Sequence, residues 1–436
     1  MPVDTFRRLH PLTPLIRGWY FVAALVAAGG QQNARELGPG RLLAVIAAAA
    51  VVGVVYGFLA WRFSRYGIVG GDLRYESGVL FRRSRRVRLD RLQAVDVVQP
   101  LLARVLGLAE LHLEVAGGGR RAEAPLAFLD ERTARALRAE LLARAAGVAE
   151  GTPEAPEVVV LTVPTGRLAA SMILSPWLVL AGFVVLSAVT SATVTGSPGL
   201  LGLALPTVFA LAPMATPFMN NFGTVVALSP DGIRLRRGLL QTRAQTVPPG
   251  RVQAVRLAQP LLWRPFGWWR VQVTVIGYGR ESMAVSSLLL PVGTRDDALT
   301  ALGLVLPGLD LDAVPLVPVP ARSRWLGPLG YKRRACGHDA QVFISRRGVL
   351  NVLVDLIGHE RMQSASISQG PLQRVLRLST LRLHTPHGPV DVRAPHRDAA
   401  QAARLLMDES ERSRFARTKA LPERWMTGHS DGVAQG

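Results

Sequence analysis

A pattern that occurs three times along the chain constrains its fold more than any other feature of the sequence. In each copy an arginine is followed at fixed spacings by Gln, Gln, Leu and Arg, and a Gly-x-Leu tripeptide precedes the first arginine by a constant distance. The repeated residues are Arg91, Gln93, Gln99, Leu102 and Arg104 in the first copy, Arg251, Gln253, Gln259, Leu262 and Arg264 in the second, and Arg361, Gln363, Gln369, Leu372 and Arg374 in the third. Identical residues at identical spacings in three windows predict that the chain contains three copies of one small module.

The composition limits the cellular compartment and the classes of partner that are expected for the chain. The chain has 436 residues, 49% of them hydrophobic, which is enough apolar material for several cores and for membrane spans. The formal net charge of +20 is almost wholly arginine, since Lys332 and Lys419 are the only lysines. A basic surface attracts the phosphates of lipid headgroups or of nucleic acid. The single cysteine, Cys336, excludes an internal disulfide and fits a reducing compartment.

Four apolar runs without a charged residue predict transmembrane helices. They cover residues 18–30, 42–60, 168–189 and 199–219. A helix of about 20 residues crosses about 30 Å of hydrocarbon, whereas a helix on a soluble domain would carry polar residues along one face. The first run also has the basic and apolar parts of a signal peptide. A second run follows it closely and aromatic residues flank the pair, so a helical hairpin is preferred. Residues 190–198 are expected to form the tight loop of a second hairpin.

The distribution of arginine predicts the orientation of these spans. Six arginines flank the ends of the runs that face the N-terminus and the modules: Arg7, Arg8, Arg17, Arg62, Arg65 and Arg167. The two predicted turns on the other side carry few charges or none. By the positive-inside rule, both termini and all three modules are expected in the cytoplasm.

Each module is predicted to be mostly β with one closing helix. In the first module Leu111, Leu113 and Val115 alternate with polar residues, which is typical of a half-buried strand. Asp130 is a candidate N-cap for a helix that ends at Ala145, and later helices are expected at residues 294–304 and 397–407. A unit of about 80 residues with this order suggests a small barrel closed by its helix. The modules are placed at residues 67–146, 223–306 and 323–410, with the hairpins within 1–66 and 147–222, a Pro-rich linker at 307–322 and a polar tail at 411–436.

The repeated motifs resemble a known bacterial family. The Gly-hydrophobic-Leu, Arg-x-Gln and Leu-x-Arg elements, together with the opening Leu-His-Pro-Leu-Thr-Pro-Leu at residues 9–15, are similar to pleckstrin-homology-like (PH-like) membrane proteins of the YdbS/YdbT type. The resemblance implies a multi-domain protein of the bacterial inner (cell) membrane, with four transmembrane helices in two hairpins and three PH-like β-barrel modules, each closed by a C-terminal helix. It also implies a role in envelope stress or in resistance to antimicrobial peptides.

Two interpretations of the repeated residues stay open at the level of sequence. In the first, the arginines and glutamines satisfy backbone groups at a corner of the barrel, while Leu102, Leu262 and Leu372 fill its core. In the second, the arginines and glutamines of the three copies form an interaction surface that binds a phosphate or a partner peptide. The third copy differs from the others at Gly370 and Pro371, so its loop is expected to differ in shape.

Basic and aromatic clusters lie outside the repeat. Arg82, Arg83, Arg85 and Arg86 are candidate contacts for anionic lipid headgroups, and Lys332, Arg333 and Arg334 form a second cluster. A solvated face is the alternative for both. Trp263, Phe266, Trp268 and Trp269 are more typical of core or membrane-interface packing than of a base-stacking platform.

The motifs of common enzyme classes are absent from the sequence, including nucleotide-binding, zinc-protease and serine-hydrolase signatures. His384, His387 and His396 lie near Gly-Pro and Thr-Pro pairs that favour an exposed turn over a metal site, so neither a metal nor a cofactor is expected. The chain is therefore predicted to be a non-enzymatic, membrane-anchored scaffold. Its expected partners are membrane lipids and a protein, of which a one-module homologue is a candidate, but not nucleic acid. A component of a transport or export system is the alternative, although uncharged spans argue against it.

Overall fold

The computed structural model describes residues 61–69, 72–77, 83–88, 92–115, 123–145, 157–196, 215–229, 232–276 and 287–419, with isolated positions between 6 and 59. The chain divides into two compact units. Unit 1 contains Met1–Glu154 together with Gln241–Ala244, and unit 2 contains Ala155–Leu240 with Gln245–Gly436. A short strand segment of the second repeat therefore belongs to the same unit as the first repeat.

Unit 1 holds two antiparallel sheets and a helix. The first sheet has the order β1 (Arg7–Arg8), β2 (Arg65–Val69), β3 (Asp72–Ser77) and β4 (Arg83–Arg88). The second is built on β5 (Leu92–Pro100), β6 (Leu108–Val115) and β7 (Glu123–Asp130), with the short helix α2 (Leu101–Val105) between β5 and β6 and helix α3 (Glu131–Ala145) after β7. The two sheets and α3 share one core, in which Leu111 and Leu113 are fully buried, as the alternation predicts. The predicted cap is also confirmed, because the Arg132 amide donates to the Asp130 carboxylate at 3.1 Å.

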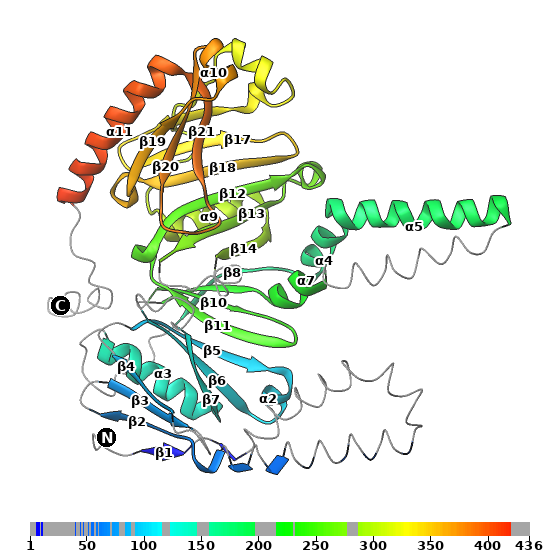
Figure 1. Ribbon diagram of the computed structural model, residues 1–436, viewed down its shortest axis with the longest axis vertical. Helices are drawn as coiled ribbons and strands as arrows, with labels where there is room; N and C mark the ends of the chain where they lie inside the picture. The colour runs from blue at the N-terminus through cyan, green and yellow to red at the C-terminus, as the bar shows by residue number, and fades with distance from the viewer. Residues whose placement is uncertain are drawn as a thin grey trace, which may run out of the picture. The chain divides into compact units, whose positions relative to one another are not determined.

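Unit 2 contains the rest of the second repeat and the third repeat (Figure 1). The second repeat supplies β8 (Val158–Thr162), β9 (Val225–Ser229), β10 (Gly232–Arg237), β11 (Gln241–Val247), β12 (Val252–Pro260), β13 (Trp269–Val275), β14 (Leu288–Gly293), the 3-10 helices η5 (Pro249–Arg251) and η6 (Leu261–Phe266), and helix α9 (Arg295–Val305). The capping box of Thr294 and Asp297 begins α9 at the predicted residue.

The third repeat follows the same order. It consists of β15 (Val317–Pro318), β16 (Ala335–His338), β17 (Val342–Arg347), β18 (Asn351–Gly358), β19 (Ser364–Ser368), β20 (Leu378–His384) and β21 (Val392–Asp398), with η7 (Ala321–Leu326), η8 (Tyr331–Arg333), η9 (His359–Arg361), α10 (Pro371–Val375) and α11 (Ala399–Lys419). Strands β14-β13-β12-β18-β17-β16-β15 form one sheet, and β19-β20-β21 form another. Helix α11 continues to Lys419, past residue 410 where the third module was expected to end.

The repeats attach to one another through equivalent strands in one register. In unit 1 the segment Gln241–Ala244 pairs antiparallel with β5, and in unit 2 β18 pairs antiparallel with β12. Ala244 lies opposite Val97, and Val354 lies opposite Leu257. These two pairs occupy the same positions relative to the repeated glycine and arginine. The repeated sequence therefore specifies one docking register.

The backbone conformation explains why the Gly-x-Leu tripeptide begins with glycine. Gly238 and Gly348 have φ angles of +117° and +107°, a region that side chains with a Cβ rarely adopt. A Cβ at Gly348 would lie 1.7 Å from the Asn351 carbonyl oxygen. Only glycine fits this turn, which leads into the strand that docks on the preceding repeat.

The span predicted at residues 168–189 is wrong in its limits. Helix α4 (Thr165–Ile173) ends before Ser175, and a separate helix α5 (Pro176–Thr195) follows. The Ser175 hydroxyl accepts a hydrogen bond from the Leu178 amide at 3.3 Å, and Pro176 occupies the first helical turn, where its missing N–H costs nothing. This start signal inside the apolar run divides it into two helices.

Helix α5 is long and apolar enough to cross a membrane, and it is the only such helix among the residues that the structure describes. Only 17% of it is buried, so its apolar side chains face outward. The hydroxyls of Thr190, Thr193 and Thr195 donate to backbone carbonyls of the helix itself at 2.5 to 2.8 Å. These bonds extend α5 through residues 190–195, where a loop was expected, because they satisfy polar groups without water.

The other three predicted spans fall wholly or largely outside the described residues. Nothing described lies within residues 18–30, and the described positions between 40 and 62 are helical. At the end of the fourth run, α7 (Thr216–Asn221) is described. Most of the span at residues 199–219 lies outside the described part of the chain.

Candidate functional site

The last arginine of the repeat lies at the junction with the next repeat. In unit 1 Arg104 donates from Nη1 to the Thr242 hydroxyl at 3.2 Å. In unit 2 Arg264 donates from Nη2 to the Val349 carbonyl oxygen at 2.5 Å and to the Leu350 carbonyl oxygen at 3.3 Å. Both arginines thus contact residues of the following repeat near the start of its docking strand. Burial, with a smaller contribution from the positive charge of Arg333, lowers the pKa of Arg264.

The third copy of this arginine lies at no junction between repeats in the part of the chain that the structure describes. Arg374 is exposed, and within the described residues its guanidinium makes no hydrogen bond or ion pair. The third repeat also differs in its turn. Gly370 precedes α10, and its amide donates to the Gln373 side chain at 3.0 Å.

The repeated glutamines and the first arginines are placed differently in each copy. The Gln253 side chain is buried and donates to the Arg251 carbonyl oxygen at 3.4 Å, and Gln369 donates to the Leu378 carbonyl oxygen at 2.9 Å. Gln253 and Arg361 line one small pocket between β12 and η9. Of the remaining positions, Gln99 and Gln259 are half-buried and Gln363 is exposed. Arg91 and the side chain of Gln93 lie outside the described residues.

The prediction that the repeated leucines fill a core is wrong. Leu102 is 45% exposed and Leu372 is 68% exposed, while Leu262 is half-buried. Each leucine lies in a short helical turn, and in the first two repeats it is the next residue, Ala103 or Trp263, that is buried. A turn of three to four residues presents only one side to the sheet, so neighbouring positions cannot both face the core.

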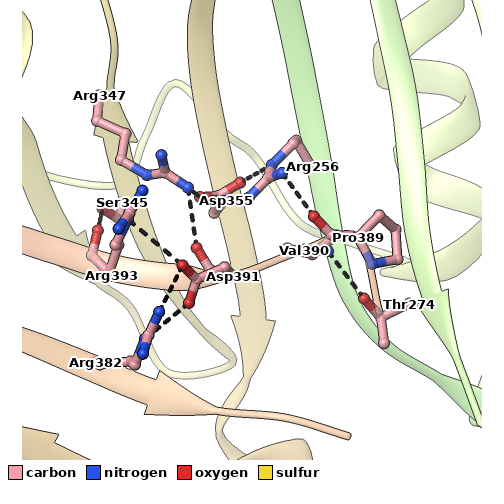
Figure 2. Close-up of polar contacts among 10 residues, drawn as sticks. All are labelled: Arg256, Thr274, Ser345, Arg347, Asp355, Arg382, Pro389, Val390, Asp391 and Arg393. Atoms are coloured by element: carbon pink, nitrogen blue, oxygen red, sulfur yellow. Dashed lines mark hydrogen bonds and ion pairs between the residues drawn. The ribbon is translucent and has the colours of Figure 1, made fainter. Parts of the chain in front are cut away.

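A buried cluster of charged residues joins the second and third repeats (Figure 2). Arg256 on β12 and Asp355 on β18 lie opposite each other in the ladder, with Nε 2.5 Å from Oδ1. Arg347 on β17 donates to the second oxygen of the same carboxylate at 2.8 Å. Asp355 is fully buried and both arginine side chains are 12% exposed. One carboxylate therefore holds two nearly buried cations from two repeats.

The cluster continues to the sheet β19-β20-β21 through Asp391. Arg382 forms a two-pronged ion pair with Asp391, with both distances 3.0 Å, and Arg347 donates to the Asp391 carbonyl oxygen at 3.0 Å. Arg256 donates to the Pro389 carbonyl oxygen at 2.7 Å. Burial raises the pKa of Asp391, but hydrogen bonds and charge from Arg382, with smaller contributions from Arg393 and Arg347, outweigh it and hold that pKa below its usual value.

Unit 1 contains a similar pair. Asp96 on β5 is fully buried and accepts hydrogen bonds from Arg243 at 3.0 and 2.7 Å. Burial raises the pKa of Asp96, and the charge of Arg243 only partly opposes it. Sequence reasoning missed both carboxylates. A lone aspartate inside an apolar strand was the available signal, because a buried charge persists only with a partner.

Exposed apolar side chains gather at one end of the second and third repeats. We define the turn surface as Leu261 and Phe266 of η6, Trp325 and Leu329 near η7 and η8, and Leu350 between β17 and β18. Leu329 is 83% exposed and Leu350 is 67% exposed. The Val349 carbonyl oxygen accepts hydrogen bonds from Arg264 and from Arg333, so η6, the β17–β18 turn and η8 are tied together. The η6 segment and the β17–β18 turn lie on the side of unit 2 from which α5 projects, and α11 lies on the opposite side (Figure 1).

The aromatic cluster of the second repeat anchors α4. Trp263 is buried, and its indole N–H donates to the Ser171 carbonyl oxygen in α4 at 3.2 Å. Phe266 stacks on Trp268 with ring centroids 4.8 Å apart. The rings therefore pack against one another and against the helix that precedes α5, which fixes the position of the turn surface relative to the start of the apolar helix.

The predicted headgroup contacts in unit 1 are only partly described. Arg86 is exposed and forms an ion pair with the buried Asp72. Arg82 lies outside the described residues, and Arg83 and Arg85 are described as positions on β4 without their side chains. In unit 2, Lys332 and Arg333 are exposed beside the turn surface.

Two of the three histidines considered as metal ligands have other partners. His384 lies 2.8 Å from the Ser366 hydroxyl, and His396 lies 2.9 Å from the Gln373 amide. Burial, with a smaller contribution from the charge of Arg334, lowers the pKa of His396. In the described part of the chain no three His, Cys, Asp or Glu side chains come together as a metal site would require.

The described chain is thus a set of repeated antiparallel modules, each followed by a helix, with an apolar helix between β8 and β9 of the second repeat. Comparison with known proteins names the modules. The profile of the bacterial PH domain matches three times, at residues 20–145, 178–299 and 285–411, and the chain belongs to this family. A curated relative, the transmembrane protein YdbT of Bacillus subtilis (strain 168), is 22% identical over 271 residues. The alignment spans about half of either protein, 54% of this chain and 54% of the relative.

Proposed function

We propose that this chain is a non-enzymatic, membrane-anchored scaffold whose bacterial PH modules bind anionic lipid headgroups at the bilayer surface. The observation that carries the proposal is the turn surface. Two of its segments, η6 and the β17–β18 turn, lie on the side of unit 2 from which α5 projects (Figure 1). The exposed Arg333 donates to the Val349 carbonyl oxygen in that turn, and the exposed Lys332 is its neighbour in the sequence. Apolar side chains flanked by cations suit the boundary between headgroups and hydrocarbon. The apolar side chains can enter the hydrocarbon while the cations contact the anionic headgroups.

The buried ion pairs around Asp355 support the proposal that the chain is a scaffold. The ion pair of Arg256 with Asp355 joins the second and third repeats in one register within unit 2, and Arg347 binds the same carboxylate from within the third repeat. Hydrogen-bonded charge pairs between strands oppose sliding, because a slip of one residue would leave each charge buried and unpaired. A fixed array of modules presents several weak binding turns at once, which raises the apparent affinity for a surface.

The proposed placement is the inner (cell) membrane of a bacterium, with the PH-like modules as barrels on the cytoplasmic side and four spans in two hairpins. It is supported by the outward-facing apolar surface of α5, by the arginines near the ends of the predicted spans and by the similarity to the B. subtilis relative, which is named a transmembrane protein. Reporter fusions after residue 436 and within the predicted turn at residues 31–41 would test it. A reporter at residue 436 that is active only outside the cytoplasm would contradict the placement.

Lipid contact can be tested with a fluorophore on the turn surface. The full chain would carry Leu350→Cys labelled with NBD and be reconstituted into vesicles of phosphatidylcholine, with or without phosphatidylglycerol. We expect the NBD emission to rise and shift to the blue when the anionic lipid is present, because the probe enters a less polar region. The matched control is Met407→Cys, because Met407 is 69% exposed against 67% for Leu350. It belongs to α11, the helix that lies on the opposite side of unit 2 (Figure 1).

Three outcomes would count against the proposal. Equal emission from the two labelled positions in anionic vesicles would show that the turn surface does not meet the bilayer. A response that persists in pure phosphatidylcholine and after Arg333→Gln with Lys332→Gln would remove the role of the headgroup charge. Hydrolytic or transfer activity of the purified chain would contradict the non-enzymatic part.

A further inference from the structure

Each docking pair between repeats uses two kinds of strand edge. One is the outer edge of the strand that carries the Arg-x-Gln motif, β5 in the first repeat and β12 in the second. The other is the outer edge of the strand that follows the Gly-x-Leu turn, which is β18 in the third repeat. Segment Gln241–Ala244 fills the edge of β5, and β18 fills the edge of β12.

One edge of each kind stays unfilled in the described part of the chain. Strand β19 is the third-repeat equivalent of β5 and β12, and it forms the end of the sheet β19-β20-β21. Strand β4 is the first-repeat equivalent of β18, and it forms the end of the sheet β1-β2-β3-β4. The two unfilled edges of one chain are therefore of complementary kinds.

We propose that β19 of one chain pairs antiparallel with β4 of a second copy of the same chain. An open strand edge carries unpaired backbone N–H and C=O groups and is a template for another strand. Both internal junctions show which strand such an edge accepts and in which register, since they are identical in equivalent positions. The second copy offers the same kind of strand, so the contact continues an interaction already present twice.

The internal register defines the residues that meet. Leu257 opposite Val354 corresponds to Ile367 opposite Ser84, and Arg256 opposite Asp355 corresponds to Ser366 opposite Arg85. Ser364, Ser366 and Ser368 on β19 are exposed, so no bulky apolar side chain has to be displaced. The exposed Arg374 is positioned on α10 as Arg264 is on η6, and it is available to bind backbone carbonyls of the incoming copy.

The contact is head-to-tail. Different surfaces meet on the two copies, so each added copy again presents one open edge of each kind. Such contacts generate a ring when the rotation closes and an open array when it does not. In a membrane the product would be a row or ring of PH modules.

Disulfide trapping in the full-length chain tests the pairing directly. One preparation carries Ser84→Cys and a second carries Ile367→Cys, and the two are mixed in detergent and oxidised. We expect a cross-linked dimer in the mixture and none in either preparation alone. Cys336 is buried, and burial raises the pKa of its thiol, so it does not compete. The control replaces Ser84→Cys by Arg88→Cys, about 13 Å along the strand at 3.3 Å per residue.

A charge pair provides a second measurement that does not depend on oxidation. Ser366→Asp would face Arg85 across the proposed ladder, whereas Ser366→Arg would place like charges opposite each other. Both changes remove the Ser366 hydrogen bond to His384, so they are matched for that loss. We expect Ser366→Asp to tighten self-association and Ser366→Arg to weaken it, each about two- to five-fold. Combining Ser366→Arg with Arg85→Asp should restore association.

The proposal fails if Ile367→Cys cross-links equally well with Ser84→Cys and Arg88→Cys, since register would then be irrelevant. It also fails if neither pair cross-links while sedimentation shows a monomer at the same concentration. Trapping of a one-module protein at Ile367→Cys in place of a second copy would assign the edge to that partner instead. Detergent without anionic lipid is used throughout, so the result is independent of headgroup binding.

Discussion

Arg256 and Asp355 lie directly opposite each other on β12 and β18, and the Nε–Oδ1 distance is 2.5 Å. The two residues come from different repeats and are 99 positions apart in the sequence. Their side chains are 12% and 0% exposed. Because the carboxylate also binds Arg347, removal of its charge would leave two guanidinium groups nearly buried without a counter-charge.

Loss of the Asp355 charge should destabilise unit 2 strongly. We expect Asp355→Asn to lower the free energy of unfolding by about 3 kcal/mol, the cost of an uncompensated buried charge. Denaturant unfolding in detergent would measure it. Asp391→Asn is the control, because that side chain is 39% exposed and should cost about 1 kcal/mol or less. Equal losses in the two variants would show that burial does not decide the effect.

The repeat-equivalent arginines Arg264 and Arg374 should differ in their contribution to stability. Arg264→Ala removes hydrogen bonds to the Val349 and Leu350 carbonyl oxygens and should cost about 1 to 2 kcal/mol, since a charged donor is lost. Arg374→Ala should change the stability of the isolated chain by less than about 0.5 kcal/mol. Thermal unfolding of both variants at a concentration where the chain is monomeric measures the difference. A large loss from Arg374→Ala would contradict the junction role.

Arg377 is a non-glycine residue in a left-handed conformation that the other repeats give to glycine. Its φ is +50°, and the equivalent residues Gly107 and Gly267 have φ angles of +67° and +64°. A side chain in this region costs about 1 kcal/mol. Arg377→Gly should therefore stabilise the chain by about 0.5 to 1 kcal/mol. Gly267→Arg is the reciprocal control and should destabilise by a similar amount.

The buried pair of His359 and Glu409 should make the docking of α11 depend on pH. His359 Nδ1 lies 2.8 Å from the Glu409 carboxylate, and its Nε2 lies 3.2 Å from the Asp339 carbonyl oxygen. Burial lowers the pKa of His359, as does Arg412, but the bond and charge of Glu409 outweigh them and raise that pKa above its usual value. The charged histidine stabilises the folded state fully below about pH 6.5, its unfolded pKa, and this contribution is lost as pH rises through the raised folded pKa.

Amide exchange in α11, corrected for the intrinsic effect of pH, would measure this dependence. Protection should fall as pH rises through the raised pKa of His359. His359→Gln should lower protection at low pH and remove the slope. His387→Gln is the exposed control and should leave the slope unchanged. An unchanged slope in His359→Gln would assign the pH dependence to another group.

Local chemistry explains what could be predicted from the sequence. The threefold Arg-x-Gln pattern predicts the repeats, the alternation at Leu111 and Leu113 predicts a buried strand face, and Asp130 and Thr294 predict where helices begin. Each of these signals depends on residues a few positions apart. The boundary inside the third apolar run also had a local signal, Ser175 followed by Pro176. A prediction based only on the absence of charged residues in the run does not detect it.

The sequence by itself determined the number of repeats, their strand and helix pattern, and the presence of an apolar helix long enough for a membrane. Only the tertiary structure decided which strand edges meet, that Asp96 and Asp355 are buried ion-pair centres, and that Leu102 and Leu372 face outward. The physical reason is that backbone hydrogen bonds between strands are the same for every sequence. The choice of neighbour depends on burial and charge pairing between residues far apart in the chain, which no local pattern records.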